Sequence, residues 1–300
     1  MAVSLKGALL LLLTRLGAPV FGEVGDFGPC LRFFYKETPP KGVGGAWYQP
    51  ICQRHMNQYH FASLYQCHRR VPFYSAYILT GGGKRPKSKW MYEPQLAFHG
   101  ASPEMHRFPQ QGTVDQNVVE SQAVLQDYAN SSYTKGHLNP SLHHQTPEDR
   151  KATFTLTNVV PQRAASNSGP WSQLEIEVRA RMADYCEGPV YMVTGALPYL
   201  SERWMANRVA VPEYMWSAYC CPTYKSSLPD TLRPYFPTYA AVGRNDAQSG
   251  GEIVPVDPKA KPSVRGYNVR RMPLNTLETV LQQRLGFHVS LFHDQCLSGL

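Results

Sequence analysis

Short apolar or alternating runs recur through the chain and predict β-strands, because glycines, prolines and polar clusters bound each run. Alternation is clearest over residues 153–157, where Phe154 and Leu156 would face a core and the intervening threonines would face the other side of a sheet. The strands predicted in this way span residues 71–79, 152–160, 190–195, 214–220 and 239–242.

Two helices are predicted beside these strands. The first begins at Pro170, which suits a first helical turn, and it carries one apolar stripe at i, i+3, i+7 and i+11 spacing. The stripe consists of Trp171, Leu174, Val178 and Met182. The second helix is predicted over residues 276–285, with Asn275 and Glu278 placed as a capping pair and Gly286 just past its end.

The rest of the chain fits a single folded unit of mixed α and β structure. Residues 244–272 are rich in glycine, proline and charge and predict a long loop. No internal repeat or low-complexity tract interrupts the sequence, which argues against a repeat array. A chain of 300 residues can bury a sizeable core. We therefore expect one domain over residues 23–300.

The N-terminus has the composition of a secretory signal peptide. Lys6 precedes an apolar run at residues 8–13, and a second apolar stretch at residues 16–21 ends among small residues suited to cleavage. We predict a signal peptide over residues 1–22 and a secreted protein, with a core or amphipathic N-terminal helix as the alternative. No later stretch approaches about 18 uninterrupted apolar residues, so we predict no membrane-spanning helix.

The cysteines fit an oxidising compartment. None of them has the paired CxxC spacing of a zinc module, so we expect disulfide partners, with one thiol left over because their number is odd. The sequence leaves the connectivity open. A glycosylation sequon at Asn130 fits the same compartment. The cysteines are Cys30, Cys52, Cys67, Cys186, Cys220, Cys221 and Cys296.

Positive charge is in excess and is concentrated in one segment. The formal net charge is +8, and it falls to +6 once Lys6 and Arg15 are removed with the predicted signal peptide. Such a surplus attracts polyanions but also promotes solubility, so its distribution matters more. A basic segment next to Trp90 and Tyr92 is suited to phosphate contact and base stacking, or is a solvated loop. Its cations are Lys84, Arg85, Lys87 and Lys89.

Candidate chemistry begins in the sequence TKGH, residues 134–137. Pro140 follows closely, so this segment should end a strand. Asn167 comes later, and Glu175 and Arg179 lie four residues apart on the first predicted helix, where they share one face. A base, an amide, a carboxylate and cations are the groups needed to cleave a phosphodiester with one divalent metal.

These residues resemble the DNA/RNA non-specific endonucleases of the ββα-metal (His-Me finger) class. The family signature reads DRGH, then approximately TFxLTNxxPQ, then an asparagine opening a helix with a glutamate and an arginine. This chain has TKGH, then TFTLTNVVPQ at residues 153–162, then Asn167, Glu175 and Arg179. The resemblance implies an α+β fold, a mixed and mainly antiparallel sheet with flanking helices and a ββα-metal motif.

The resemblance also assigns roles. His137 would be the general base, Asn167 would bind a divalent metal through its amide oxygen, and Glu175 would hold a metal-bound water. The metal would be Mg²⁺, with Mn²⁺ as an alternative, because a hard cation prefers oxygen ligands. Arg179 and Lys135 would neutralise charge around the scissile phosphate.

Two departures from the signature bear on activity. Lys135 stands where the family has arginine, and lysine offers a point charge instead of a planar bidentate fork. Thr134 replaces the family's aspartate and so removes a carboxylate.

The sequence as a whole predicts a secreted, metal-dependent endonuclease acting on DNA, RNA or both. The first alternative is a weak or inactive relative that binds extracellular nucleic acid, and the second is a purely structural secreted domain. A zinc site is not favoured, because no HExxH spacing occurs and the secreted context favours disulfides. The residues that imitate one are His143 and His144, and the group Cys52, His55, His60, Cys67 and His68.

Overall fold

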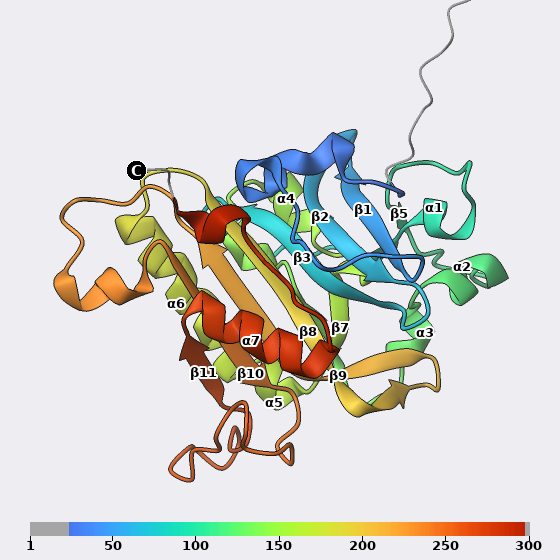
Figure 1. Ribbon diagram of the computed structural model, residues 1–300. Helices are drawn as coiled ribbons and strands as arrows, with labels where there is room; N and C mark the ends of the chain where they lie inside the picture. Colours follow the sequence, from blue (N-terminus) through green and yellow to red (C-terminus); the bar gives the residue numbers. More distant parts are fainter. Residues whose placement is uncertain (1–23, 298–300) are drawn as a thin grey trace, which may run out of the picture.

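The computed structural model describes residues 24–297, in which seven strands form one antiparallel sheet (Figure 1). The predicted signal peptide lies outside the described residues. Strand order across the sheet is β1-β2-β3-β8-β9-β10-β11. The strands are β1 (Tyr48–His55), β2 (Gln58–Gln66), β3 (Val71–Leu79), β8 (Val190–Met205), β9 (Val209–Cys220), β10 (Thr238–Arg244) and β11 (Val269–Met272).

Sequence patterning located the centre of this sheet better than its edges. The predicted strand at residues 71–79 coincides with β3, and β8, β9 and β10 contain the predicted strands but are longer. The prediction of one loop over residues 244–272 is wrong at both ends. Arg244 ends β10, and Val269–Met272 forms the edge strand β11.

The predicted strand at residues 152–160 is wrong over most of its length. Ala152 ends a helix, a 3₁₀ turn covers Leu156–Asn158, and only the last two predicted residues belong to a strand. The threonines do not face away from the core either. Thr155 and Thr157 are fully buried, because their hydroxyl groups form hydrogen bonds inside the protein. The alternating apolar and threonine side chains of this segment are therefore all buried in a loop, and they do not mark the two faces of a strand.

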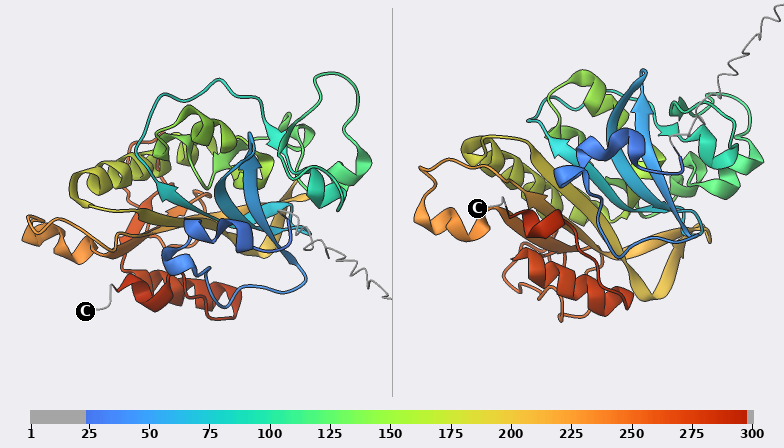
Figure 2. Two further views of the ribbon diagram at one scale, coloured as in Figure 1. Left: turned by 90° about the horizontal axis from the view of Figure 1, so that it is seen from above. Right: turned by 45° about the horizontal axis from the view of Figure 1, so that its top comes forward.

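The molecule has three layers, with the sheet in the middle (Figures 1 and 2). One face is covered by α6 (Pro170–Tyr185), the short helices and the ribbon of β6 (Thr134–His137) and β7 (Val159–Gln162). The opposite face is covered by α7 (Leu274–Leu285) and by the 3₁₀ helices η1 (Gly28–Phe33), η2 (Tyr35–Glu37) and η6 (His293–Cys296). The remaining elements are β4 (Met91–Tyr92), β5 (His106–Arg107), α1 (Pro94–Ala97), α2 (Gln116–Ser121), α3 (Leu125–Tyr128), α4 (Pro147–Ala152), α5 (Ala164–Asn167), η3 (Ser141–His143), η4 (Leu156–Asn158) and η5 (Asp230–Tyr235).

The two long helices bury the faces expected from their sequences. In α6 the predicted apolar stripe is confirmed, since all four of its side chains are buried. In α7 the predicted end is confirmed, because Gly286 takes the left-handed conformation with φ of 79°. The predicted capping pair is wrong. The helix begins two residues earlier at Leu274, and the Glu278 carboxylate accepts hydrogen bonds from Leu291 N and Gln295 Nε2 instead.

Three disulfide bonds tie peripheral segments to the sheet, as the cysteine count predicted. Cys30–Cys52 joins η1 to β1, Cys220–Cys296 joins the end of β9 to η6, and Cys186–Cys221 joins the end of α6 to the residue after β9. Cys67 is the free cysteine of the described residues. No helix within residues 24–297 is long and apolar enough to cross a membrane.

Candidate active site

The TKGH segment forms β6, which pairs antiparallel with β7 beside the main sheet. His137 is the last residue of the strand and lies opposite Val159, while Thr134 lies opposite Gln162. Gly136 is required by this pairing. A Cβ atom at position 136 would lie 2.2 Å from Gln162 Oε1, so any other residue would displace the buried Gln162 side chain.

Asn158 holds the chain that follows His137. Its Oδ1 accepts from the backbone N–H of Asn139 at 3.0 Å and from the hydroxyl of Ser75 at 2.8 Å. Its Nδ2 donates to the carbonyls of Asn139 and Thr153 at 2.9 and 3.0 Å. Because the amide is fully buried and uses all these bonds, it fixes the two ends of the β6–β7 connection relative to β3.

A row of polar side chains runs across the sheet beneath this connection. Along four neighbouring strands the paired residues are serine or threonine, and consecutive hydroxyls bond at 3.0 Å between β2 and β3 and at 2.8 Å between β8 and β9. Gln53 extends the row on β1 and donates to Thr157 Oγ1 at 2.9 Å. We call this set the polar row: Gln53, Ser63, Ser75, Thr194 and Ser217.

His137 is held between aromatic rings. Its ring centroid lies 5.3 Å from that of Trp90 and 5.1 Å from that of Phe154. Its Nε2 is buried and has no hydrogen-bond partner among the described residues. Burial, reinforced by the positive charge of Arg85, lowers the pKa of His137 to about 3. The imidazole is therefore neutral at physiological pH.

Asn167 ends α5 and is tied to the start of β6. Its Nδ2 donates to Thr134 Oγ1 at 2.8 Å, and that hydroxyl donates to the backbone carbonyl of Gln162 at 2.8 Å. The amide nitrogen is thus turned toward the ribbon, and Oδ1, the other end of the planar amide, makes no bond to Thr134.

Glu175 lies on α6 with an unusually protonated carboxyl group. Burial raises its pKa to about 8, while the indole of Trp171 and the positive charge of Arg85 oppose the shift. Its backbone carbonyl accepts from His143 Nε2 at 3.0 Å, and Tyr77 donates to His143 Nδ1 at 2.9 Å. This relay fastens the helix turn carrying Glu175 to strand β3.

Arg85 is the cation of the basic segment that reaches the site. Its guanidinium lies over the Phe154 ring at 5.3 Å from the centroid, and its charge acts on both His137 and Glu175. Lys84, Lys87 and Lys89 are exposed side chains of the same segment. The sequence did not distinguish among these four cations, because a loop has no regular spacing from which the direction of each side chain could be inferred.

Arg179 and Lys135 flank the site from two other elements. A Cβ atom on Gly82 would lie 2.3 Å from Arg179 Nη1, so the basic segment approaches α6 closely there. Within the described residues Arg179 and Glu175 form no ion pair with each other. Lys135 Nζ lies 5.4 Å from the centroid of Trp90 and 5.0 Å from that of Tyr128, and burial lowers its pKa.

The donor set fits one hard cation held mainly by water and phosphate oxygens. In residues 24–297 no three His, Cys, Asp or Glu side chains gather in a way that could hold a metal ion. The Asn167 Oδ1 atom is an oxygen ligand of the type that Mg²⁺ prefers, and Mg²⁺ commonly retains several waters. Glu175 is a carboxylate whose oxygens could hold a coordinated water.

The residues that imitate a zinc site are engaged elsewhere. Cys52 is in a disulfide, and His60 bonds to Asp149 Oδ1 at 2.7 Å and to the carbonyl of His55 at 2.9 Å. His144 Nε2 donates to Asn139 Oδ1 at 2.6 Å. His60 and His144 thus hold residues of the β6–β7 connection, and Cys52 ties η1 to β1.

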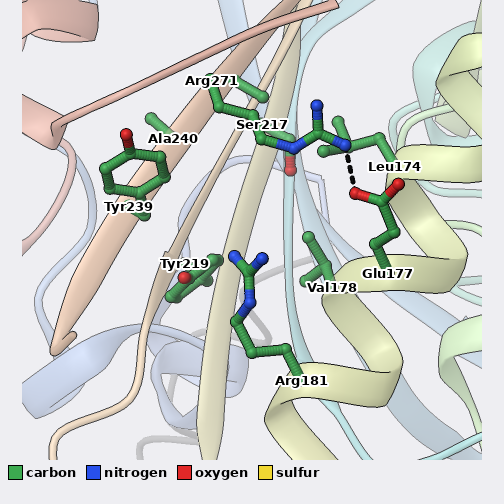
Figure 3. Close-up of a pocket in the computed structure, with 10 residues that line it drawn as sticks. Leu174, Glu177, Val178, Arg181, Ser217, Tyr219, Tyr239, Ala240 and Arg271 are labelled. Atoms are coloured by element: carbon green, nitrogen blue, oxygen red, sulfur yellow. Dashed lines mark hydrogen bonds and ion pairs between the residues drawn. The ribbon is translucent and has the colours of Figure 1, made fainter. Parts of the chain in front are cut away.

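The other flank of α6 carries a separate small cavity (Figure 3). Glu177 forms an ion pair with Arg271 of β11 across it, and Arg181 extends toward Tyr219. Its volume of about 20 Å³ accommodates a single water molecule and no larger ligand. The side of α6 facing the β6–β7 ribbon is therefore the one that presents the candidate chemistry.

The fold and the site geometry define a class: an α+β protein with an antiparallel ribbon and helix that present a histidine, an asparagine and a glutamate. Residues 48–259 match the DNA/RNA non-specific endonuclease family. The chain belongs to that family.

Individual relatives agree with this placement. The chain is 32% identical over 212 residues to the human Endonuclease domain-containing 1 protein and 33% identical over 204 residues to that of mouse. These matches cover 68% and 66% of this chain, but the chain spans only 41% and 40% of the lengths of those relatives. Zebrafish mitochondrial nuclease EXOG is 29% identical over 180 residues, which is 59% of this chain and 49% of that protein.

A solved structure supports the fold. A chain in the crystal structure of the EndoG/EndoGI complex superposes with a TM-score of 0.50 at 18% identity, covering 85% of this chain and 88% of that chain. The predicted α+β class with a mainly antiparallel sheet is confirmed.

Sequence reasoning missed the residues that support the site. Phe154, which packs against His137, and Asn158, which fixes the connection, were not identified as functional, and Trp90 was considered only for base stacking. Phe154 and Asn158 lie inside the TFTLTN motif used for the resemblance, so the signal was present. The alternating residues of this motif were interpreted as a strand, whereas the structure has a loop there.

Proposed function

We propose that this protein is a metal-dependent endonuclease that hydrolyses phosphodiester bonds of DNA, RNA or both without strong sequence specificity. The observation that carries the proposal is geometric: the buried Nε2 of His137 has no partner among the described residues, and the Phe154 ring beside His137 also lies under the Arg85 guanidinium. A neutral imidazole beside a phosphate-binding cation is the arrangement needed to activate water at a phosphodiester.

His137 would act as the general base and accept a proton from the attacking water at its free nitrogen. Asn167 Oδ1 would hold the divalent ion, which we expect to be Mg²⁺, and a single amide oxygen would also accept Mn²⁺. A bound divalent cation polarises the phosphate and stabilises the leaving oxygen. Glu175 in its ionised form would orient a coordinated water through hydrogen bonding.

The cations would neutralise the charge that builds up on the phosphate. Arg85, whose charge acts on His137, would contact the scissile group, while Arg179 would act from the α6 side. Lys135 would add a more distant point charge, because its ammonium group is turned toward Trp90 and Tyr128.

Exposed lysines would bind the backbone of the substrate. Lys84, Lys87 and Lys89 lie on the segment that leads to Arg85 and can contact successive phosphates. Phosphate contacts position a nucleic acid without reading its sequence, which agrees with weak sequence specificity.

We also propose that the protein acts in the secretory pathway or outside the cell. Three disulfide bonds in the described structure and the composition of residues 1–22 support this location, because disulfides persist in oxidising compartments.

The test is incubation of the purified protein with plasmid DNA and with RNA, in Mg²⁺ or EDTA. We expect cleavage only with the metal, and a loss of about 10²–10⁴-fold in His137→Ala and a comparable loss in Asn167→Ala. Cleavage that persists in EDTA, or in either variant, would exclude the proposal.

A binding protein without turnover is the second candidate, and the placement of Lys135 favours it. Its ammonium group is partly buried against two aromatic rings and so is less available to a phosphate than an arginine fork would be. Salt-dependent binding of nucleic acid with no cleavage in Mg²⁺ or Mn²⁺ would establish this function instead.

A further inference from the structure

Thr134 stands at the centre of a short hydrogen-bond chain between β7, β6 and α5. Its hydroxyl donates to the carbonyl of Gln162 and accepts from Asn167 Nδ2, with both bonds at 2.8 Å. A threonine hydroxyl has one proton and two acceptor lone pairs. Its single proton is used by the carbonyl, so only acceptor capacity remains toward Asn167.

This series of hydrogen bonds determines which end of the Asn167 amide faces the ribbon. The reversed amide would place Oδ1 against the lone pairs of the Thr134 oxygen, with no proton between the two atoms. That arrangement loses a hydrogen bond and brings two acceptors together. The amide nitrogen therefore faces Thr134, and Oδ1 faces away from the ribbon.

From this geometry we propose that Thr134 is a positioning residue that orients Asn167 Oδ1 as the metal ligand. The inference rests on the proposed function, because it requires Asn167 to bind the metal. Thr134 touches neither the metal nor the substrate in this arrangement. It acts through the amide of Asn167, as partners of metal ligands commonly do.

The neutral hydroxyl replaces the orienting capacity of the family's aspartate but not its charge. A carboxylate at position 134 could also accept from Asn167 Nδ2, yet it has no proton for the Gln162 carbonyl. The threonine satisfies both neighbours. The TKGH sequence thus keeps the ligand orientation while removing one negative charge from the neighbourhood of the cation.

The test measures Mn²⁺ binding to the purified protein by calorimetry, together with the melting temperature and the metal dependence of cleavage. Thr134→Val removes the hydroxyl at nearly constant shape, and Thr134→Ser retains it. Thr38→Val is the matched control, because the Thr38 hydroxyl also donates to a backbone carbonyl, that of Lys36, at 2.9 Å.

We expect Thr134→Val to weaken Mn²⁺ binding by about 10–100-fold, with Thr134→Ser and Thr38→Val close to the unsubstituted protein. Excess Mn²⁺ should restore most of the cleavage rate of Thr134→Val, because the variant disturbs ligand orientation and not the base. A purely structural role would lower the melting temperature without this recovery.

Two results would overturn the inference: Mn²⁺ affinity unchanged in Thr134→Val, or equal weakening in Thr134→Val and Thr134→Ser. The proposed function fails in a different way. If Asn167→Ala binds Mn²⁺ as tightly as the unsubstituted protein, Asn167 is not the ligand, and both the assigned metal site and the role of Thr134 are wrong.

Discussion

The face of the sheet beneath the β6–β7 ribbon buries the polar row, whereas the face beneath α7 buries mainly apolar side chains and two disulfide bonds. Both faces come from the same strands, since successive residues point to opposite sides. Ser75 faces the ribbon while its neighbours Tyr74 and Ala76 pack in the apolar layer with Trp216. Apolar side chains pack on both sides, but buried hydrogen bonds specify the geometry where the candidate chemistry lies, and two disulfide bonds reinforce the opposite side.

Removing a cross-link from the α7 face is expected to give the largest change in stability. The Cys220–Cys296 bond closes a loop with a sequence separation of 76 residues. Replacing both cysteines with serine should lower the free energy of unfolding by about 4 kcal/mol. Below the melting temperature the cleavage rate should stay within about twofold, because this bond does not touch the site. Denaturant unfolding and kcat measured on the same preparation check both parts.

Disrupting the ribbon face should instead reduce stability and activity together. Asn158→Leu leaves the backbone groups of Asn139 and Thr153 without these partners and removes one partner of the Ser75 hydroxyl, at a cost of about 3 kcal/mol. Activity of the folded fraction should fall at least about tenfold, because the residues after His137 lose their support. An Asn158→Leu variant that keeps full activity would remove the distinction between the faces.

The acid limb of the pH–activity profile should come from Glu175 and not from His137. The pKa of Glu175 is raised to about 8 and that of His137 is lowered to about 3, so only the carboxyl changes charge between pH 6 and 8. If the ionised carboxylate is required, kcat/KM should rise about tenfold per pH unit below 8. Glu175→Gln should flatten this limb, whereas a limb near pH 6.5 would assign it to a histidine.

Buried neutral histidines should make the ribbon face sensitive to acid. Burial lowers the pKa of His143 to about 4, below the value of about 6.5 in the unfolded chain. Its stabilising contribution is therefore complete above pH 6.5 and is lost as the pH falls toward 4, by about 2 kcal/mol at pH 5. His143→Gln can keep both hydrogen bonds without titrating. Unfolding measured at pH 7 and 5 should show a smaller difference in this variant.

The smallest effect is expected at Lys135. Replacing it with arginine restores a planar fork that can contact phosphate through two N–H groups, which should raise kcat/KM about fivefold. Lys89→Arg is the matched control, because Lys89 is an exposed lysine of the basic segment. Equal changes in the two variants would show that position 135 has no special relation to the phosphate.

The sequence correctly predicted those elements in which apolar residues face a core. It located β3 and the apolar stripe of α6 and indicated that His137 ends a strand. It failed at residues 153–158, where threonine and asparagine are buried because they bond to the polar row. The spacing of apolar residues predicts which side chains face a core, but it does not predict which polar side chains form buried hydrogen bonds.

The candidate site divides in the same way. Residue types and their order indicated His137, Asn167 and Glu175, but the roles of Thr134 and Arg85 depend on which atoms face each other. A loop cation such as Arg85 has no periodic pattern that would distinguish it from its neighbours. Its position became evident only with the fold.

Gly136 gives the site a vulnerability that no list of ligands would reveal. A side chain at this position would displace Gln162. The backbone carbonyl of Gln162 accepts the hydrogen bond that the Thr134 hydroxyl donates. We therefore expect a substitution at position 136 to weaken the proposed metal binding indirectly, although the proposed metal ligand and the proposed base would be chemically unchanged.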